Sequence, residues 1–423
     1  MKIGFWSLFA LVTGSQIGSG IFMLPANLAP YGVFSLLGWI VSGVGAIALA
    51  LVFAKLCGWF PKTGGPHVYA QEAFGRQVGF FTGWTYWVVS WVSTTAVIVA
   101  SVGYLSPLFG PFLPNEMLTW QIVILALVTW LNLQGVYAAG RVESVLTIIK
   151  FLPLIILPAL GIIYFNAENI QMTAAVAAMP TSIKMSHVIL LTLWGFIGLE
   201  SGTTPADSVE NPSKTIPKAI VFGTIAVAGI YLFNSIGILG AMPSSELAQS
   251  KAPYCDLTQH LFGGQWYLLV SLIASVLCLG TLNAWALASG QIALGLSQDK
   301  LVPAFFGKTN KHQAPYVALL ISAFGILPLL FLTTHTTLAD QIAMIIDFSV
   351  TAFLFVYVVA CLAFFKILRK QEKQSIVSWI YGLIALCFCL WVLSETSLRT
   401  LGVAALFTLS GIPVLFLRLK NQN

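Results

Sequence analysis

Long apolar stretches separated by short polar clusters run the whole length of the chain. A helix needs about 20 apolar residues to cross a bilayer, and most of these stretches reach that length. The pattern therefore predicts an all-α integral membrane protein with twelve transmembrane helices joined by short loops. The predicted spans are roughly 5–29, 34–59, 78–108, 119–136, 142–165, 187–204, 217–241, 266–296, 314–333, 341–365, 376–394 and 398–417.

Composition supports a single transmembrane domain over residues 1–423. The 423 residues are 58% hydrophobic and only 8% charged, whereas a soluble domain is about 25% charged. The six cysteines are scattered, and no Cys/His cluster has metal-site spacing. We therefore predict no metal, no cofactor and no enzyme active site. The net charge of +6 does not indicate a nucleic-acid partner, because the basic residues are dispersed between the spans.

The basic residues also predict the orientation of the spans. With the N-terminus inside, sixteen of the twenty Lys and Arg residues fall on the inner side, as short cytoplasmic loops require. Lys184, Lys251 and Arg399 fall outside, and Lys150 lies within a span. The sequence thus predicts a multi-pass protein of the inner (cytoplasmic) membrane with both termini in the cytoplasm.

Two spans carry matching interruptions. Span one contains Thr-Gly-Ser-Gln-Ile-Gly-Ser-Gly at 13–20, and span six contains Ile-Gly-Leu-Glu-Ser-Gly-Thr-Thr-Pro at 197–205. The two motifs lie five spans apart, an odd number, so the second is inverted relative to the first. This arrangement is typical of transporters with inverted repeats and helices broken at the midplane. It predicts repeats over about 5–165 and 187–369, with extra helices over about 376–418. The alternative is that these glycines only allow close helix packing.

A helix that breaks inside a membrane leaves polar backbone groups that must line a cavity. Amides at the start of a half-helix favour a carboxylate, and carbonyls at the end of one favour an ammonium group. One site for each sign of charge describes an α-amino acid. The predicted amides are those of Ser19, Gly20 and Ile21, and the predicted carbonyls are those of Gln16, Ile17, Trp194 and Ile197.

Three motifs resemble a known family. They are Gly-Ser-Gly-Ile-Phe at 18–22 followed by Pro25-Ala26, Phe-Pro-Lys-Thr-Gly-Gly-Pro at 60–66, and Gly-Leu-Glu-Ser at 198–201 followed by Glu-Asn-Pro at 210–212 and Ile216-Pro217. Together they look like the amino acid-polyamine-organocation superfamily of permeases. The resemblance implies a five-plus-five inverted-repeat fold with two additional helices, alternating access around one amino acid site, and a possible homodimer.

Within this superfamily the chain is most similar to bacterial arginine/agmatine and related basic amino acid/amine antiporters. The resemblance implies that Trp194 covers the substrate and that Trp285 both contacts the substrate and acts as a gate residue. It also implies an outer gate of hydrogen-bonded residues, formed by Tyr86, Glu200 and Tyr357. Further pocket contacts are implied at Ser90 and Ser349. The chain departs from the arginine branch at Ser15 and Thr94, because that branch has Asn at both positions.

Two ionisable residues lie near mid-membrane, where charge is expensive and commonly functional. Glu200 is a candidate proton-binding gate residue or a structural partner of tyrosine. Lys150 resembles the fifth-helix lysine of proton-coupled permeases, whose ammonium replaces a sodium ion, or it is a fixed counter-charge. Asp347 favours a cation if it faces the pathway.

These features predict a secondary amino acid transporter that exchanges a basic, arginine-like amino acid for an amine or another amino acid. The main alternative is a proton-coupled symporter of neutral amino acids, which Lys150 favours. An ion channel is less favoured, because the polar breaks are isolated and form no continuous pore.

Overall fold

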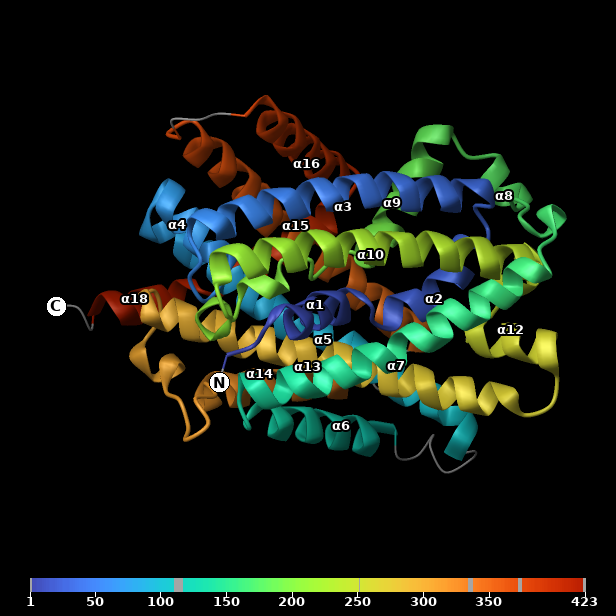
Figure 1. The fold of residues 1–423 in the computed structure, drawn as a ribbon, viewed down its shortest axis with the longest axis horizontal. Coiled ribbons are helices and arrows are strands. Elements are labelled where there is room, and N and C mark those ends of the chain that lie inside the picture. Colours follow the sequence, from blue (N-terminus) through green and yellow to red (C-terminus); the bar gives the residue numbers. More distant parts are fainter. Residues whose placement is uncertain (1, 110–116, 251, 334–337, 372–374, 421–423) are drawn as a thin grey trace.

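The computed structural model describes residues 2–109, 117–250, 252–333, 338–371 and 375–420, which form a bundle of long helices lying side by side (Figure 1). Among these residues there is no strand, only isolated bridges at Ile3–Val209 and Tyr31–Met172. The long unbroken helices are α3 (Val33–Trp59), α5 (Arg76–Phe109), α6 (Met117–Asn132), α7 (Val136–Ile163), α10 (Pro212–Ala241), α13 (Trp266–Gln298), α14 (Tyr316–Thr333), α15 (Leu338–Leu368) and α16 (Ile376–Ser394).

The first and sixth predicted spans are interrupted, as expected from their glycine motifs. The first comprises α1 (Phe5–Gln16) and α2 (Ser19–Leu28), and the sixth comprises α9 (Thr181–Trp194) followed by an unwound segment and the short turns η3 (Ser201–Thr203) and η4 (Ala206–Ser208). The connecting segments carry α4 (Pro66–Phe74), η2 (Ala167–Asn169), α8 (Ala174–Ala177), α11 (Ser244–Leu247), α12 (Pro253–Phe262) and η5 (Ala304–Gly307).

Nine helical stretches in the described part of the chain are long and apolar enough to cross a membrane, and α6 and α14 are shorter apolar helices. The chain is thus an all-helical, multi-pass membrane protein. The one predicted span outside these eleven is the sixth, because α9 ends at Trp194 and its continuation is unwound.

Two predicted helix starts, those of the fifth and sixth spans, were wrong. The fifth span was expected from residue 142, but α7 begins at Val136, directly after Gly135 turns the chain with a φ of 93°. The sixth was expected from residue 187, but α9 begins at Thr181. The twelfth span, expected over 398–417, is present as one apolar stretch over Leu398–Leu417, within which α17 (Leu398–Leu409) is followed by α18 (Ile412–Lys420).

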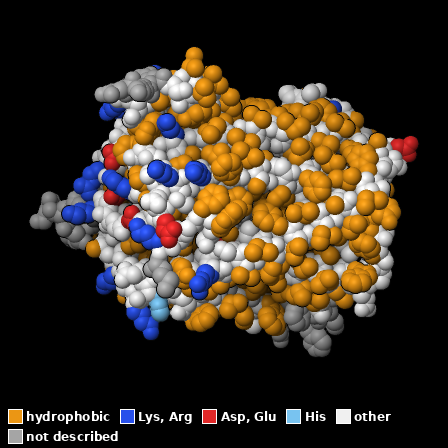
Figure 2. All heavy atoms as spheres, in the orientation of Figure 1, with side chains coloured by type: hydrophobic (Ala, Val, Ile, Leu, Met, Phe, Trp, Pro, Cys, Tyr) orange, Lys and Arg blue, Asp and Glu red, His pale blue; other side chains and the backbone are white. Residues whose placement is uncertain are grey.

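The outer surface is suited to lipid. Hydrophobic side chains cover most of the face in Figure 2, and basic side chains gather at the end where α4, α18 and the start of α1 lie in Figure 1. Large apolar side chains such as Ile148, Leu152 and Phe222 are more than half exposed. Because hydrocarbon solvates such surfaces, their exposure indicates helix faces that lie against the bilayer.

The broken helix lies at the centre of the bundle. α1 packs against α7, α10 and α13, while α13 packs along α5 in the most extensive helix contact of the described structure. The lipid-facing helices therefore enclose both helix breaks, which places their backbone polar groups inside protein.

Candidate functional site

The carbonyl groups at the end of α1 accept hydrogen bonds from side chains of two neighbouring helices, α10 and α13. The Gln16 carbonyl accepts from the Tyr231 hydroxyl at 2.8 Å, and the Ile17 carbonyl accepts from the Thr281 hydroxyl at 2.8 Å. The Ser15 carbonyl accepts from Trp285 Nε1 at 3.2 Å. Each carbonyl retains a second lone pair, so these groups can still accept from a ligand.

The second break is built on Gly198, whose φ of 104° favours glycine. Its carbonyl accepts a hydrogen bond from the Ser15 hydroxyl at 2.9 Å, and the same hydroxyl lies 2.8 Å from that of Ser201. These two bonds join the breaks directly. The predicted pairing of the two glycine motifs is therefore a contact in the structure.

Glycines also allow the aromatic side chains to approach the backbone. A Cβ on Gly20 would lie 2.7 Å from Cδ1 of Trp194, and a Cβ on Gly198 would lie 3.1 Å from Cζ2 of Trp285. Both distances are shorter than ordinary carbon contacts. The Trp194 ring thus rests on the first turn of α2, and the Trp285 ring rests on the unwound segment after α9.

The breaks face a cavity with about 350 Å³ of space outside the protein atoms. Among its described lining residues no side chain is charged, and Gln16 Oε1 is a buried acceptor with no partner in the described part of the chain. The cavity is lined by the predicted residues Gln16, Gly20, Trp194, Ile197 and Trp285, together with Ser15, Gly18, Ser93, Val97 and Thr281.

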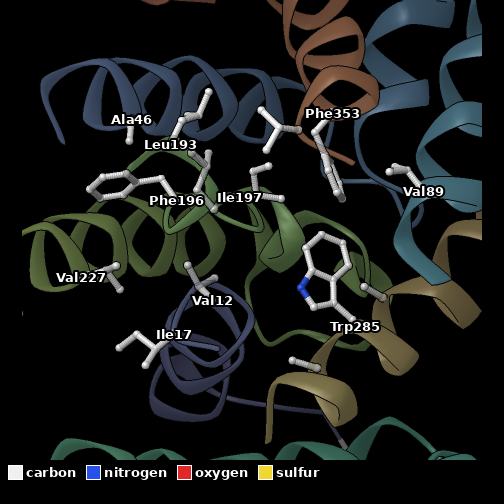
Figure 3. Close-up of a cluster of buried hydrophobic side chains, with 14 of the residues drawn as sticks. Val12, Ile17, Ala46, Val89, Leu193, Phe196, Ile197, Val227, Trp285 and Phe353 are labelled. Carbon is white, nitrogen blue, oxygen red and sulfur yellow. The ribbon is translucent and has the colours of Figure 1, made fainter. Parts of the chain in front are cut away.

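Trp285 separates this cavity from a second, more apolar one between α5, α6, α13 and α14, which has about 420 Å³ of space outside the atoms. Figure 3 shows the indole projecting from α13 beneath Phe353 and beside Ile197. Thr94, predicted to bind substrate, lines the second cavity and donates to the Trp91 carbonyl at 2.6 Å. Its neighbour Ser93 lines the cavity at the breaks instead.

The predicted gate residues surround one buried carboxyl group. The Tyr357 hydroxyl donates to Glu200 Oε2 at 2.5 Å and accepts from the Gly198 amide at 3.4 Å. The Tyr86 hydroxyl lies within electrostatic reach of this carboxyl but makes no hydrogen bond within the described residues. Phe353 connects this group to Trp285, with ring centroids 5.1 Å from Trp285 and 6.2 Å from Tyr357.

The predicted gate group lies toward the end of the bundle at which α1 begins, which is the inner end in the predicted orientation. Glu200 follows the break in the sixth span, and the chain then continues to Val209, beside Ile3 at the start of α1. The Ile3 amide donates to the Ser208 carbonyl at 2.8 Å. The gate therefore lies between the cavity and the end of the bundle where α1 begins.

Lys150 lies beside the end of α1 and has a partner, Glu143, that the sequence analysis did not identify. Its ammonium donates to the Gly14 carbonyl at 3.0 Å and forms an ion pair with Glu143 at 3.4 Å. Both side chains are fully buried. The spacing of seven residues puts the pair on one face of α7, two turns apart, and this was the available sequence signal.

The other predicted residues lie near the cavity without lining it. Ser90 is buried and donates to the Trp87 carbonyl at 2.6 Å, Ile21 is buried in the core, and Ser349 is buried with no hydrogen-bond partner among the described residues. Ser19 begins α2, but its side chain and that of Asp347 lie outside the described residues.

The turn before α4 is hydrogen-bonded to the segment after the second break and to the end of α13. The Gly64 amide donates to the Thr204 carbonyl at 2.9 Å, and His67 Nε2 lies 3.1 Å from Asp299 Oδ2 at the end of α13. Burial alone would raise the pKa of Asp299, but the hydrogen bond and charge of His67, with Lys62 and Arg76, lower it below the usual value. This contact between His67 and Asp299 joins α4 to the end of α13.

Residues 3–416 match the amino acid permease family. The chain belongs to this family. The permease is 33% identical to the putrescine transporter PotE of Haemophilus influenzae over 374 residues, which cover 88% of this chain and 86% of the relative. It is 29% identical to the cadaverine/lysine antiporter of Escherichia coli over 430 residues, covering 100% of this chain and 96% of the relative. It is 30% identical to the putrescine transporter PotE of Escherichia coli, covering 86% of this chain and 83% of the relative.

Family membership confirms the superfamily resemblance inferred from the motifs. The permease is a transporter and not an enzyme. These relatives are named for putrescine, cadaverine and lysine. They confirm the resemblance to basic amino acid and amine antiporters, and they do not single out arginine and agmatine.

Proposed function

We propose that this permease exchanges a basic amino acid for an amine by alternating access around the cavity at the helix breaks. The observation that carries the proposal is the lining of this cavity: Trp194 and Trp285, the free acceptor of Gln16, and no charged side chain among the described lining residues. Aromatic faces attract a desolvated cation by about 2 kcal/mol. They do so without a buried carboxylate that would hold the cargo too tightly to release it.

An exchanger of this kind must accept cargo with and without a carboxylate. In the proposed pose, the amides at the start of α2 hold the carboxylate of the amino acid, aided by the positive end of the helix dipole. Because these amides are neutral, an amine without a carboxylate leaves no buried charge unpaired. The α-ammonium lies near Gln16 Oε1 and the carbonyls that end α1, and the distal cation lies against the indoles.

The relatives narrow the cargo to be tested first. Their names indicate transport of putrescine, and of lysine against cadaverine. We therefore infer lysine and a linear diamine as the first exchange pair, and arginine with agmatine as the second. We also propose twelve membrane crossings as two inverted repeats, over about 5–165 and 187–369, plus the extra helices, with both termini on the cytoplasmic side of an inner membrane.

Uptake of radiolabelled lysine into proteoliposomes tests this function. The vesicles are preloaded with cadaverine, putrescine, lysine, arginine, agmatine, a neutral amino acid or buffer alone. We expect uptake only with a basic amino acid or amine inside, and without a pH gradient. Equal uptake into buffer-loaded vesicles would refute exchange.

A second candidate is a proton-coupled symporter of neutral amino acids, which the buried Lys150 beside the end of α1 favours. This function predicts that a neutral amino acid accumulates in buffer-loaded vesicles under an inward proton gradient. The same set of vesicles distinguishes the two candidates.

A further inference from the structure

Five side chains and one carbonyl form a continuous polar chain through the interior, from α6 to the end of α1. Asn132 Nδ2 donates to Asn283 Oδ1 at 3.2 Å, and Asn283 Nδ2 donates to Glu143 Oε2 at 3.0 Å. Glu143 Oε1 pairs with Lys150, which donates to the Gly14 carbonyl at 3.0 Å and to the Thr281 hydroxyl at 3.3 Å. Both carboxylate oxygens of Glu143 are therefore bonded.

Two glycines make room for the charged pair. A Cβ on Gly14 would lie 1.9 Å from Glu143 Oε1, and a Cβ on Gly280 would lie 2.9 Å from Lys150 Nζ. Any side chain at either position would displace the pair. The space between α1, α7 and α13 is thus shaped for a carboxylate and an ammonium together.

The pair is isolated from the cavity and from water. Glu143 and Lys150 are fully buried, and neither lines the cavity at the breaks. Among the described residues of this polar chain of side chains, only Thr281 also lines the cavity. Besides Glu143, the titratable side chain beside Lys150 among the described residues is the buried thiol of Cys278 on α13, while α1 contributes a carbonyl. Breaking such a pair leaves an uncompensated buried charge.

We propose that Glu143 is the resident counter-ion of Lys150, and that the pair keeps its proton throughout the transport cycle, so that exchange is independent of the proton gradient. A proton that moves from Nζ of Lys150 to Oε1 of Glu143 stays within the pair, which exchanges none with either solution. Glu143 is thus a positioning residue that acts through Lys150 on the end of α1. This inference rests on the proposed exchange function and explains why a buried lysine in this permease does not imply proton symport.

Removing one partner should create a proton-dependent transporter. We compare wild type, Glu143→Gln, Lys150→Met, the double variant carrying both changes, and Glu168→Gln, which removes an exposed carboxylate in η2 as a control. Each protein is reconstituted and assayed with whichever cargo the wild type exchanges. Rates are measured with and without an inward pH gradient.

We expect the gradient to change the rates of the wild type, the control and the double variant by less than about twofold, and those of each single variant by at least about fivefold. Cargo affinity should stay within about threefold in all of them, because neither residue lines the cavity. A purely structural pair would leave the gradient response of every variant unchanged. Gradient-driven accumulation by the wild type, or a folded Glu143→Gln that is as insensitive as wild type, would overturn the proposal.

Thermal unfolding of the purified proteins gives a second readout that does not depend on transport. Each single variant should lower the melting temperature, and the double variant should lower it by less than the sum, because both charges are then absent. If neither single variant folds, the double variant decides: the proposal requires it to fold and to exchange cargo without a gradient response. If the wild type moves no tested cargo, the exchange function fails while this melting comparison still tests the pairing.

Discussion

Replacing Trp285 with leucine should weaken binding of a cationic cargo about thirtyfold, because about 2 kcal/mol of desolvated cation–π attraction is lost. The indole is 4% exposed and rests against the helix breaks, so little water screens its face. Trp285→Phe keeps an aromatic face and loses only the 3.2 Å hydrogen bond to the Ser15 carbonyl. We expect that variant to lose about fivefold, corresponding to about 1 kcal/mol for one hydrogen bond.

The assay is equilibrium binding of radiolabelled lysine to purified protein, with a melting curve for each variant. Trp84→Phe is the matched control, because Trp84 bonds Ser410 on the far side of α5, away from the cavity. A Trp285→Leu protein that melts normally and binds lysine within twofold of wild type would remove this indole from the cation site. Equal losses in the leucine and phenylalanine variants would assign the effect to the hydrogen bond.

Three further substitutions test the surroundings of the cavity. Gly20→Ala should raise the KM for exchange about tenfold with little change in melting temperature, because the new Cβ displaces the Trp194 ring. An unchanged KM would show that the Trp194 ring does not contact the cargo. Tyr357→Phe should lower the melting temperature by a few degrees and slow exchange, because removing the 2.5 Å hydrogen bond leaves the buried Glu200 carboxyl without this donor, at a cost of about 1–3 kcal/mol. Melting and exchange identical to those of wild type would contradict this. Asp299→Asn should destabilise the protein at pH 7, and the difference in melting temperature from wild type should shrink as pH falls below about 4, because the interactions that lower the pKa of Asp299 stabilise the folded state only while the carboxylate is charged. A difference that grows on acidification would contradict this reasoning.

The sequence predicted most of the helices and the central role of the breaks, because apolar length and glycine motifs are local signals. The matched Ile-Gly and Ser-Gly pairs marked the two segments that meet at Ser15 and Gly198. Trp194 and Trp285 were identified by resemblance, and both line the cavity. The breaks could be predicted from composition and spacing alone, whereas the two tryptophans depended on the family resemblance.

The features that were missed depend on helix phase and on contacts across helices. The run Ser93-Thr94-Thr95 offers three similar residues in a row, and only the rotation of α5 decides that the first faces the breaks. Glu143 was overlooked because the predicted span began at residue 142, which made this carboxylate look like a charge at a boundary. The partner of Lys150 was therefore missed because the predicted helix began at residue 142 and not at Val136.

The contact between the start of the chain and the segment after the second break has a practical consequence. Ile3 is tied to both sides of Val209, through the Ser208 carbonyl and the Glu210 amide at 2.8 and 3.0 Å. A bulky fusion tag attached ahead of Ile3 would be tethered to both broken segments and would restrain their movement. Affinity tags therefore belong after α18, whereas a small environment-sensitive dye at position 2 would report on rearrangements of the broken segments.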